Sequence, residues 1–104
     1  MLDVRYPSEE ELLRIRTWPA AEGHELMDYV RERWGYADAG YWARSETPES
    51  VTYRLSTAGW SGNEDLVVAL QENLLFWSMY WQSSRRNEHN EFIIPLQHAA
   101  EATL

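Results

Sequence analysis

The chain has 104 residues, 44% of them hydrophobic, and a formal net charge of −8 that results from 17 acidic residues against nine arginines. Its length suits a single domain, and the absence of cysteine excludes disulfides and thiolate metal sites. The acidic balance disfavours direct binding to nucleic acid, because phosphates require positive charge. It suits solubility or docking onto a basic protein surface.

Neither a secretory signal nor a membrane span is visible. The first residues, MLDVRYPSEEE, lack a basic segment followed by an apolar one. The longest apolar stretch, Leu66 to Trp81, is interrupted by Gln71, Glu72 and Asn73, which would lie near the centre of a bilayer. We therefore expect a cytoplasmic protein.

The N-terminal third predicts two helices. Ser8 and Glu11 form a capping box that begins a short helix, and Pro19 ends it. A second helix is predicted from about residue 21 to 34, with Gly35 as its C-terminal stop. One apolar face of this helix is formed by Leu26, Met27, Val30 and Trp34.

A β-hairpin is predicted next, with strands over 40–45 and 50–56. The second strand alternates, so that Val51, Tyr53 and Leu55 share one face. The joining segment, Glu-Thr-Pro-Glu, has the chemistry of a turn.

The second half predicts one long helix and a final strand. Ser61 and Glu64 form a second capping box, and the helix is expected from about residue 62 to 82. Residues 83–90 indicate a polar loop, and residues 91–96 indicate a strand.

The predicted elements have the order ααββαβ, which indicates an α+β fold. We expect a three-stranded, mostly antiparallel sheet packed against the long apolar helix, with Pro95 on an edge strand. Residues 1–96 would form a single α+β domain, and residues 97–104 a frayed C-terminal tail.

The long helix is apolar over most of its circumference. Leu70, Leu74 and Trp77 are expected in the core, against the second strand of the hairpin. Any apolar remainder predicts an interaction surface, and a homodimer is expected because one small sheet cannot cover this helix and the tryptophans. A narrow polar line is formed by Glu64, Gln71, Ser78 and Gln82.

The first candidate binding site is the turn that begins the long helix. Free backbone N–H groups at a helix N-terminus can hold an anion, although Glu64 and Asp65 would repel a phosphate. The alternative is structural, with Ser61 and Glu64 as caps and Trp60 as a packing staple. The candidate residues of this turn are Trp60, Ser61, Asn63 and Glu64.

Arg85, Arg86 and His89 form the second candidate. The arginines can clamp a carboxylate or phosphate, or they can complement the dipole at a helix C-terminus. A helix of roughly 18–20 residues separates its ends by about 27–30 Å. The two candidates are therefore not expected to share one small substrate within a subunit, unless the helix breaks.

No catalytic residue, metal site or cofactor is predicted. His24, His89 and His98 lack metal-ligand spacing, and neither a nucleophile elbow nor a cysteine is present. Adjacent carboxylates such as Glu64 and Asp65 diverge by about 100° on a helix and would not face one substrate. The sequence favours a non-catalytic protein.

The chain resembles small uncharacterised proteins encoded by phages and prophages, which share a GWSGNED turn and an SSRR segment. The likeness rests on the segments STAGWSGNED, ALQEN, FW and SSRR. The likeness spans about Tyr53 to Phe92. Where that pattern has glycines after SSRR, this chain has Asn87 and Glu88. The resemblance implies no activity, but it does imply a phage context, in which small acidic proteins often bind host proteins.

The sequence thus favours a small acidic interaction protein. We expect a phage-type inhibitor of a host defence or nucleic-acid-handling protein that acts by binding a basic surface. One alternative is an immunity protein that neutralises a toxin. Another is a small enzyme or ligand-binding module centred on Trp60–Glu64. An open, polar, concave pocket at that turn would favour the module, and a filled, flat surface would favour the binder.

Overall fold

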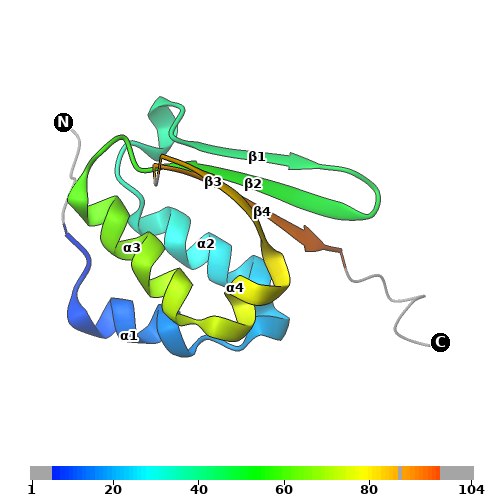
Figure 1. The fold of residues 1–104 in the computed structure, drawn as a ribbon, viewed down its shortest axis with the longest axis horizontal. Helices are drawn as coiled ribbons and strands as arrows, with labels where there is room; N and C mark the ends of the chain where they lie inside the picture. The colour runs from blue at the N-terminus through cyan, green and yellow to red at the C-terminus, as the bar shows by residue number, and fades with distance from the viewer. Residues whose placement is uncertain (1–5, 87, 97–104) are drawn as a thin grey trace.

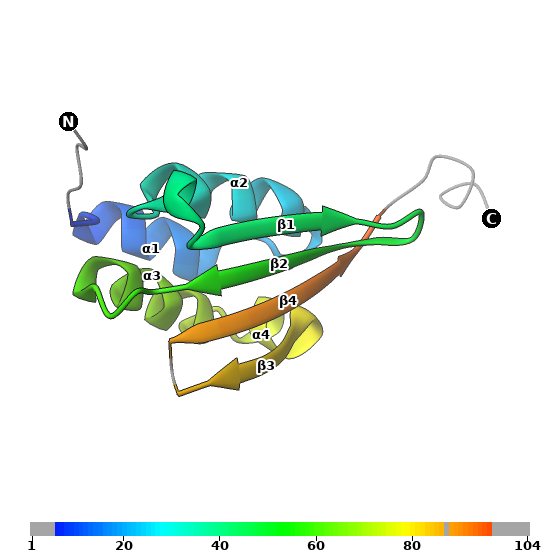
Figure 2. The same ribbon diagram turned by 90° about the horizontal axis from the view of Figure 1, so that it is seen from above.

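The four α-helices of the described chain pack on one face of a single antiparallel sheet (Figure 1). A computed structural model describes residues 6–86 and 88–96. Seen from above, the strands lie in front and the α-helices behind, and no described α-helix covers the opposite face of the sheet (Figure 2). In chain order the elements are α1 Glu9–Thr17, η1 Ala20–Glu22, α2 Gly23–Arg33, η2 Ala37–Ala39, β1 Trp42–Glu46, β2 Ser50–Ser56, α3 Ser61–Glu72, α4 Leu74–Tyr80, β3 Trp81–Arg85 and β4 His89–Pro95.

The fold is α+β, as predicted, but the sheet has four strands in the order β1-β2-β4-β3 instead of three. The additional strand is β3. Its residues were predicted as the end of the long helix, up to residue 82, and the start of the polar loop over 83–90. Because β1 and β3 form the edges, the edge position predicted for Pro95 is wrong. Pro95 ends the interior strand β4 beyond Phe92, where pairing with β3 has stopped, so its missing N–H leaves no gap on that side.

The predicted hairpin is confirmed. β1 and β2 pair antiparallel, and Val51, Tyr53 and Leu55 face the helices and are buried. The core between sheet and helices also contains Ile15, Leu26, Met27, Val30, Leu66, Leu70, Phe76, Phe92 and Ile94.

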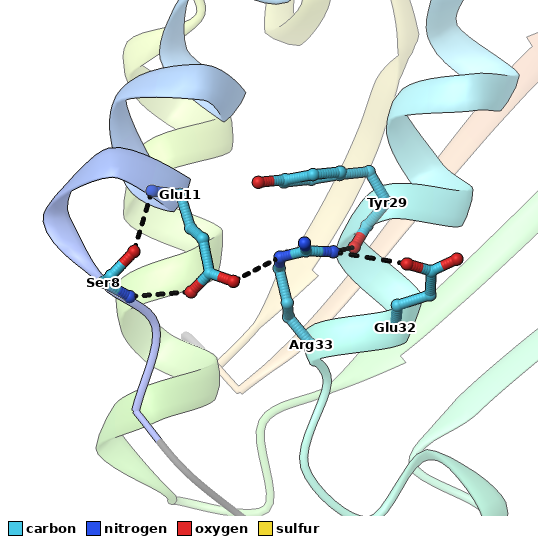
Figure 3. A network of polar contacts seen from close by, with 5 residues as sticks. All are labelled: Ser8, Glu11, Tyr29, Glu32 and Arg33. Carbon is cyan, nitrogen blue, oxygen red and sulfur yellow. Dashed lines mark hydrogen bonds and ion pairs between the residues drawn. The ribbon is translucent and has the colours of Figure 1, made fainter.

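The first helix begins as predicted, and its cap also contacts α2 (Figure 3). The Ser8 hydroxyl accepts from the Glu11 N–H, and the Glu11 carboxylate accepts from the Ser8 N–H. The same carboxylate accepts from Arg33 Nε at 2.9 Å, and the Arg33 guanidinium lies 3.5 Å from the centroid of the Tyr29 ring. These contacts tie the start of α1 to the end of α2.

The second predicted helix is confirmed in outline, but Gly35 is not its stop. Trp34 has an extended backbone and ends α2. Gly35 is buried, and its N–H donates to Asn63 Oδ1 at 2.8 Å. The glycine is therefore held by a distant side chain, which the sequence around it does not indicate.

The single long helix predicted over 62–82 is interrupted at Asn73, where α3 ends and α4 begins in a new direction (Figure 1). The Asn73 amide donates to the carbonyl oxygens of Ile15 at 3.0 Å and Trp18 at 2.9 Å, both at the end of α1. Its side-chain oxygen accepts from the Phe76 N–H at 3.3 Å and so caps α4. One buried asparagine stops α3, binds α1 and starts α4.

This break changes which side chains are buried. Leu70 is buried and Trp77 packs against the core, as predicted, but Leu74 is exposed. In a continuous helix Leu70 and Leu74 would lie on one face, a turn apart. The prediction for Leu74 is wrong because the helix does not continue through Asn73.

The described residues share one hydrophobic core. Among them, no helix has the length and apolar content needed to cross a bilayer. The tail predicted over 97–104 lies outside the described residues.

Candidate functional site

The second capping box, predicted at Ser61 and Glu64, is wrong. Trp60 is the N-cap of α3 and makes no side-chain capping bond, so Ser61 is already the first helical residue. The Ser61 hydroxyl instead donates to the hydroxyl of Tyr6 at 3.1 Å. Glu64 is exposed in the first turn, where its negative charge suits the helix dipole.

Asn63 is the most deeply buried member of this turn, with no exposed surface. Its amide nitrogen donates to the carbonyl oxygens of Gly35 at 3.1 Å and Thr57 at 3.4 Å, while its oxygen accepts the Gly35 N–H. A buried amide with these partners joins the start of α3 to the segment after α2. Its polar groups are used in the fold and are not exposed to solvent.

Gly62 is required by the position of the Trp60 ring. A Cβ on Gly62 would lie 2.2–2.5 Å from atoms of that ring, closer than any side chain tolerates. Tyr6 covers the ring from another side, with centroids 5.2 Å apart. The Trp60 ring therefore packs on the backbone of its own turn.

The β3–β4 hairpin brings the second candidate segment back to this turn. The Thr57 N–H donates to the Glu88 carbonyl oxygen at 2.8 Å, so the two candidate segments are neighbours in one subunit. The predicted separation assumed a continuous helix, and it fails because β3 runs back from α4. Arg86 lies in the connection with a φ of 51° and is exposed.

Arg85 and His89 lie elsewhere, in a groove on the uncovered face of the sheet. The groove has a volume of about 610 Å³ and is lined by residues from all four strands and from the segment before β1. Arg85 and His89 are opposite one another on β3 and β4, and Ser56 of β2 is opposite His89. These three side chains form a row across the sheet.

A second row lies two residues along the strands. Arg54 of β2 faces Glu91 of β4, and Ser83 of β3 faces Glu91 from the other side. Arg54 Nε lies 2.9 Å from Glu91 Oε2, so this pair largely neutralises itself. Arg54 and Ser56 are groove residues that the sequence does not single out, although their outward positions in the alternating strand β2 are a usable signal.

The helix-facing side of the sheet contains a separate polar cluster around Tyr53. His24 Nδ1 lies 3.0 Å from the Tyr53 hydroxyl, and His24 Nε2 lies 3.1 Å from the Pro95 carbonyl oxygen. Burial raises the pKa of Tyr53, while the Arg44 guanidinium beside it acts in the opposite direction. The hydrogen bond to Tyr53 raises the pKa of Arg44 in turn. This cluster joins α2 to the sheet.

The helix α4 presents three large apolar side chains to solvent: Leu74 is 77% exposed, Leu75 63% and Met79 51%. We call these three residues the α4 patch. Trp81 follows at the start of β3 and stacks on Trp77, with ring centroids 5.5 Å apart. In the described part of the chain no strand pairs with the outer side of β3, so an apolar helix face runs directly into an open sheet edge.

Within residues 6–86 and 88–96, no group of three or more His, Asp or Glu residues is arranged to hold a metal ion. No protein-family model matches the chain, and no curated protein or solved structure matches it either. Function is therefore inferred from the turn, the groove and the α4 patch.

Proposed function

We propose that this chain is a small non-catalytic interaction protein of the phage type, which binds and inhibits a host defence or nucleic-acid-handling protein. The α4 patch carries this proposal. α4 exposes three large apolar side chains within seven residues, and large apolar patches on soluble monomers mark contact sites. Because α4 contains no charged residue, a partner can cover it without burying an unpaired charge. The nearby Trp81 is of a residue type enriched in binding hot spots.

The distribution of charge supports a basic partner. Exposed carboxylates outnumber arginines on α1 to α3, so the helical layer that carries α4 is also acidic. Such a field accelerates encounter with a positively charged surface. The host cytoplasm, where this partner would be found, is the proposed location. The exposed carboxylates on these helices are Glu9, Glu10, Glu25, Asp28, Glu32, Glu64, Asp65 and Glu72.

The alternative functions receive different support. An immunity protein would use the same surface, with a toxin as the partner. An enzyme or ligand-binding module at Trp60–Glu64 receives less support, because Asn63 is fully buried and the Trp60 ring covers Gly62.

The proposed homodimer would use the α4 patch when the partner is absent. Sedimentation of the free protein is expected to show concentration-dependent association, and the double variant Leu74→Ser/Leu75→Ser is expected to remain monomeric. If the wild-type protein stays monomeric at high concentration, the homodimer proposal is wrong. The proposal of a protein partner would not be affected by that result.

The partner can be identified by placing a photoreactive benzoylphenylalanine at position 75 in the native host. We expect one dominant cross-linked protein with the probe at position 75. Position 13 is the control, because Leu13 of α1 is 54% exposed against 63% for Leu75 but lies outside the α4 patch, so no dominant cross-link is expected there. With that protein purified, Leu74→Ser/Leu75→Ser should weaken binding by roughly 30-fold or more, the loss expected for hot-spot residues. The matched control Leu13→Ser should bind as the wild type does.

Electrostatic steering gives a second readout. Reversing the exposed Glu10 and Glu49 to Arg should slow association and flatten its salt dependence, with little effect on dissociation. Unchanged binding of the Leu74→Ser/Leu75→Ser variant, an acidic contact surface on the partner, or enzyme-like turnover of a small substrate would each contradict the proposal.

A further inference from the structure

The groove is lined mainly by outward-facing residues of the sheet and of the segment before β1. The α4 patch is separate from it, because α4 lies among the helices on the other side of the sheet (Figure 2). The walls of the groove contain Arg54, Arg85 and His89, whereas Glu91 is the single carboxylate among its lining residues. In a chain with a net charge of −8, this is a local reversal of the overall charge. The groove thus offers hydrogen-bond donors and positive charge to a bound anion.

Among the described residues, no carboxylate pairs with Arg85, whereas Arg54 is paired with Glu91. Arg85 is exposed on the edge strand β3 and lines the groove. An exposed guanidinium in a concave site, with its forked donors unpaired, is suited to a planar or tetrahedral oxyanion.

The sheet register places further donors beside Arg85. His89 and then Ser56 follow it on adjacent strands, and neighbouring strands are about 4.8 Å apart. Because all three side chains are on one face, a guanidinium, an imidazole N–H and a hydroxyl can reach the same bound group. The second row adds the hydroxyl of Ser83.

We propose that this groove binds the phosphate or carboxylate group of a small organic molecule, held by Arg85 and His89 with support from the Ser56 hydroxyl. The rest of the molecule would extend toward β1, where Tyr41 and Ala43 provide an aromatic ring and an apolar methyl group. This site is independent of the partner proposed for the α4 patch.

Nuclear magnetic resonance titration tests the proposal on the whole protein. ¹⁵N-labelled wild type is titrated with inorganic phosphate and, separately, with acetate, at constant pH and ionic strength. We expect saturable shifts at the amides of Ser56, Arg85 and His89 with at least one of these anions. Saturation with phosphate alone identifies a phosphate site, with acetate alone a carboxylate site, and with both a general oxyanion site.

Arg86 provides a matched control, because it is the next residue, carries the same charge and does not line the groove. Arg85→Gln should weaken anion binding roughly tenfold or more, as the loss of a charge-assisted hydrogen bond requires. His89→Ala should also weaken it, whereas Arg86→Gln should stay within about twofold of wild type. Equal losses in Arg85→Gln and Arg86→Gln, or no saturable shift with either anion, would overturn the proposal.

Discussion

In the segment from Trp60 to Tyr80, a polar side chain is buried at the first end and apolar side chains are exposed at the second. The first end is polar in sequence, yet Asn63 is completely buried and makes three hydrogen bonds. The second end is apolar in sequence, yet α4 exposes three large side chains. The difference shows that burial here depends on what the rest of the chain reaches, and not on the polarity of the residue.

The burial of the first end and the exposure of the second are explained by which other parts of the chain lie over them. The turn is covered by the segment after α2 and by Tyr6, so its polar atoms find fixed partners. The outer face of α4 is turned away from the sheet by the break at Asn73, and no described element returns to cover it. Apolar residues left in this position cost stability in water and are suited to a partner.

The largest difference in stability is expected between two leucines that the sequence places in one helix, Leu70 and Leu74. Leu70→Ala should destabilise the protein by roughly 2–5 kcal/mol, because Leu70 is fully buried. Leu74→Ala should change stability by less than about 0.5 kcal/mol, since its side chain is exposed. Urea denaturation of both variants measures the difference, and equal losses would mean that α3 and α4 form one buried helix.

Asn63 tests whether the turn is structural. Asn63→Ala removes the partners of the Gly35 N–H and carbonyl groups, and each orphaned buried group costs about 1–3 kcal/mol. We expect a loss of roughly 2–4 kcal/mol in thermal or urea unfolding, with partner binding preserved in the folded fraction. A stable Asn63→Ala variant that loses binding would make this turn the functional site.

Gly62 tests the packing of Trp60. Gly62→Ala forces the indole ring away from the backbone, and such overpacking typically costs about 1–3 kcal/mol. A lower unfolding midpoint should be accompanied by a red shift of tryptophan fluorescence as the ring becomes exposed. Wild-type stability of Gly62→Ala would show that the ring has another position.

The smallest effect is expected at Ser61. Because Ser61 does not cap α3, Ser61→Ala should change the free energy of unfolding by less than about 0.5 kcal/mol, whereas a true cap would lose about 1 kcal/mol. Chemical denaturation with replicate measurements resolves these values. The larger loss would restore the capping box predicted from the sequence.

Local patterns predicted much of the fold. The capping box at Ser8 and Glu11 involves residues three apart, and the alternation of β2 is contained within seven residues. Both signals are complete within a short window, and the structure confirms both. The α+β class followed from the order of such elements.

The missed features depend on contacts between distant residues. Asn73 breaks the helix because the carbonyl groups of Ile15 and Trp18 are available to it, and a helical pattern cannot show that. β3 was missed because its sequence is mostly polar and an irregularity between Trp81 and Ser83 interrupts its register. The groove depends on the pairing of β2, β3 and β4, so its rows appear only once the register is known.

The contacts that hold α1 at its two ends have a consequence for the dynamics of α4. α1 has nine residues, fewer than an isolated helix needs to persist, so its order depends on Arg33 at one end and Asn73 at the other. When α1 undocks, the Asn73 amide loses two acceptors while it still caps α4. We therefore expect α1 and the start of α4 to open together, so that hydrogen exchange at the α1 amides and at Phe76 reports one shared opening event.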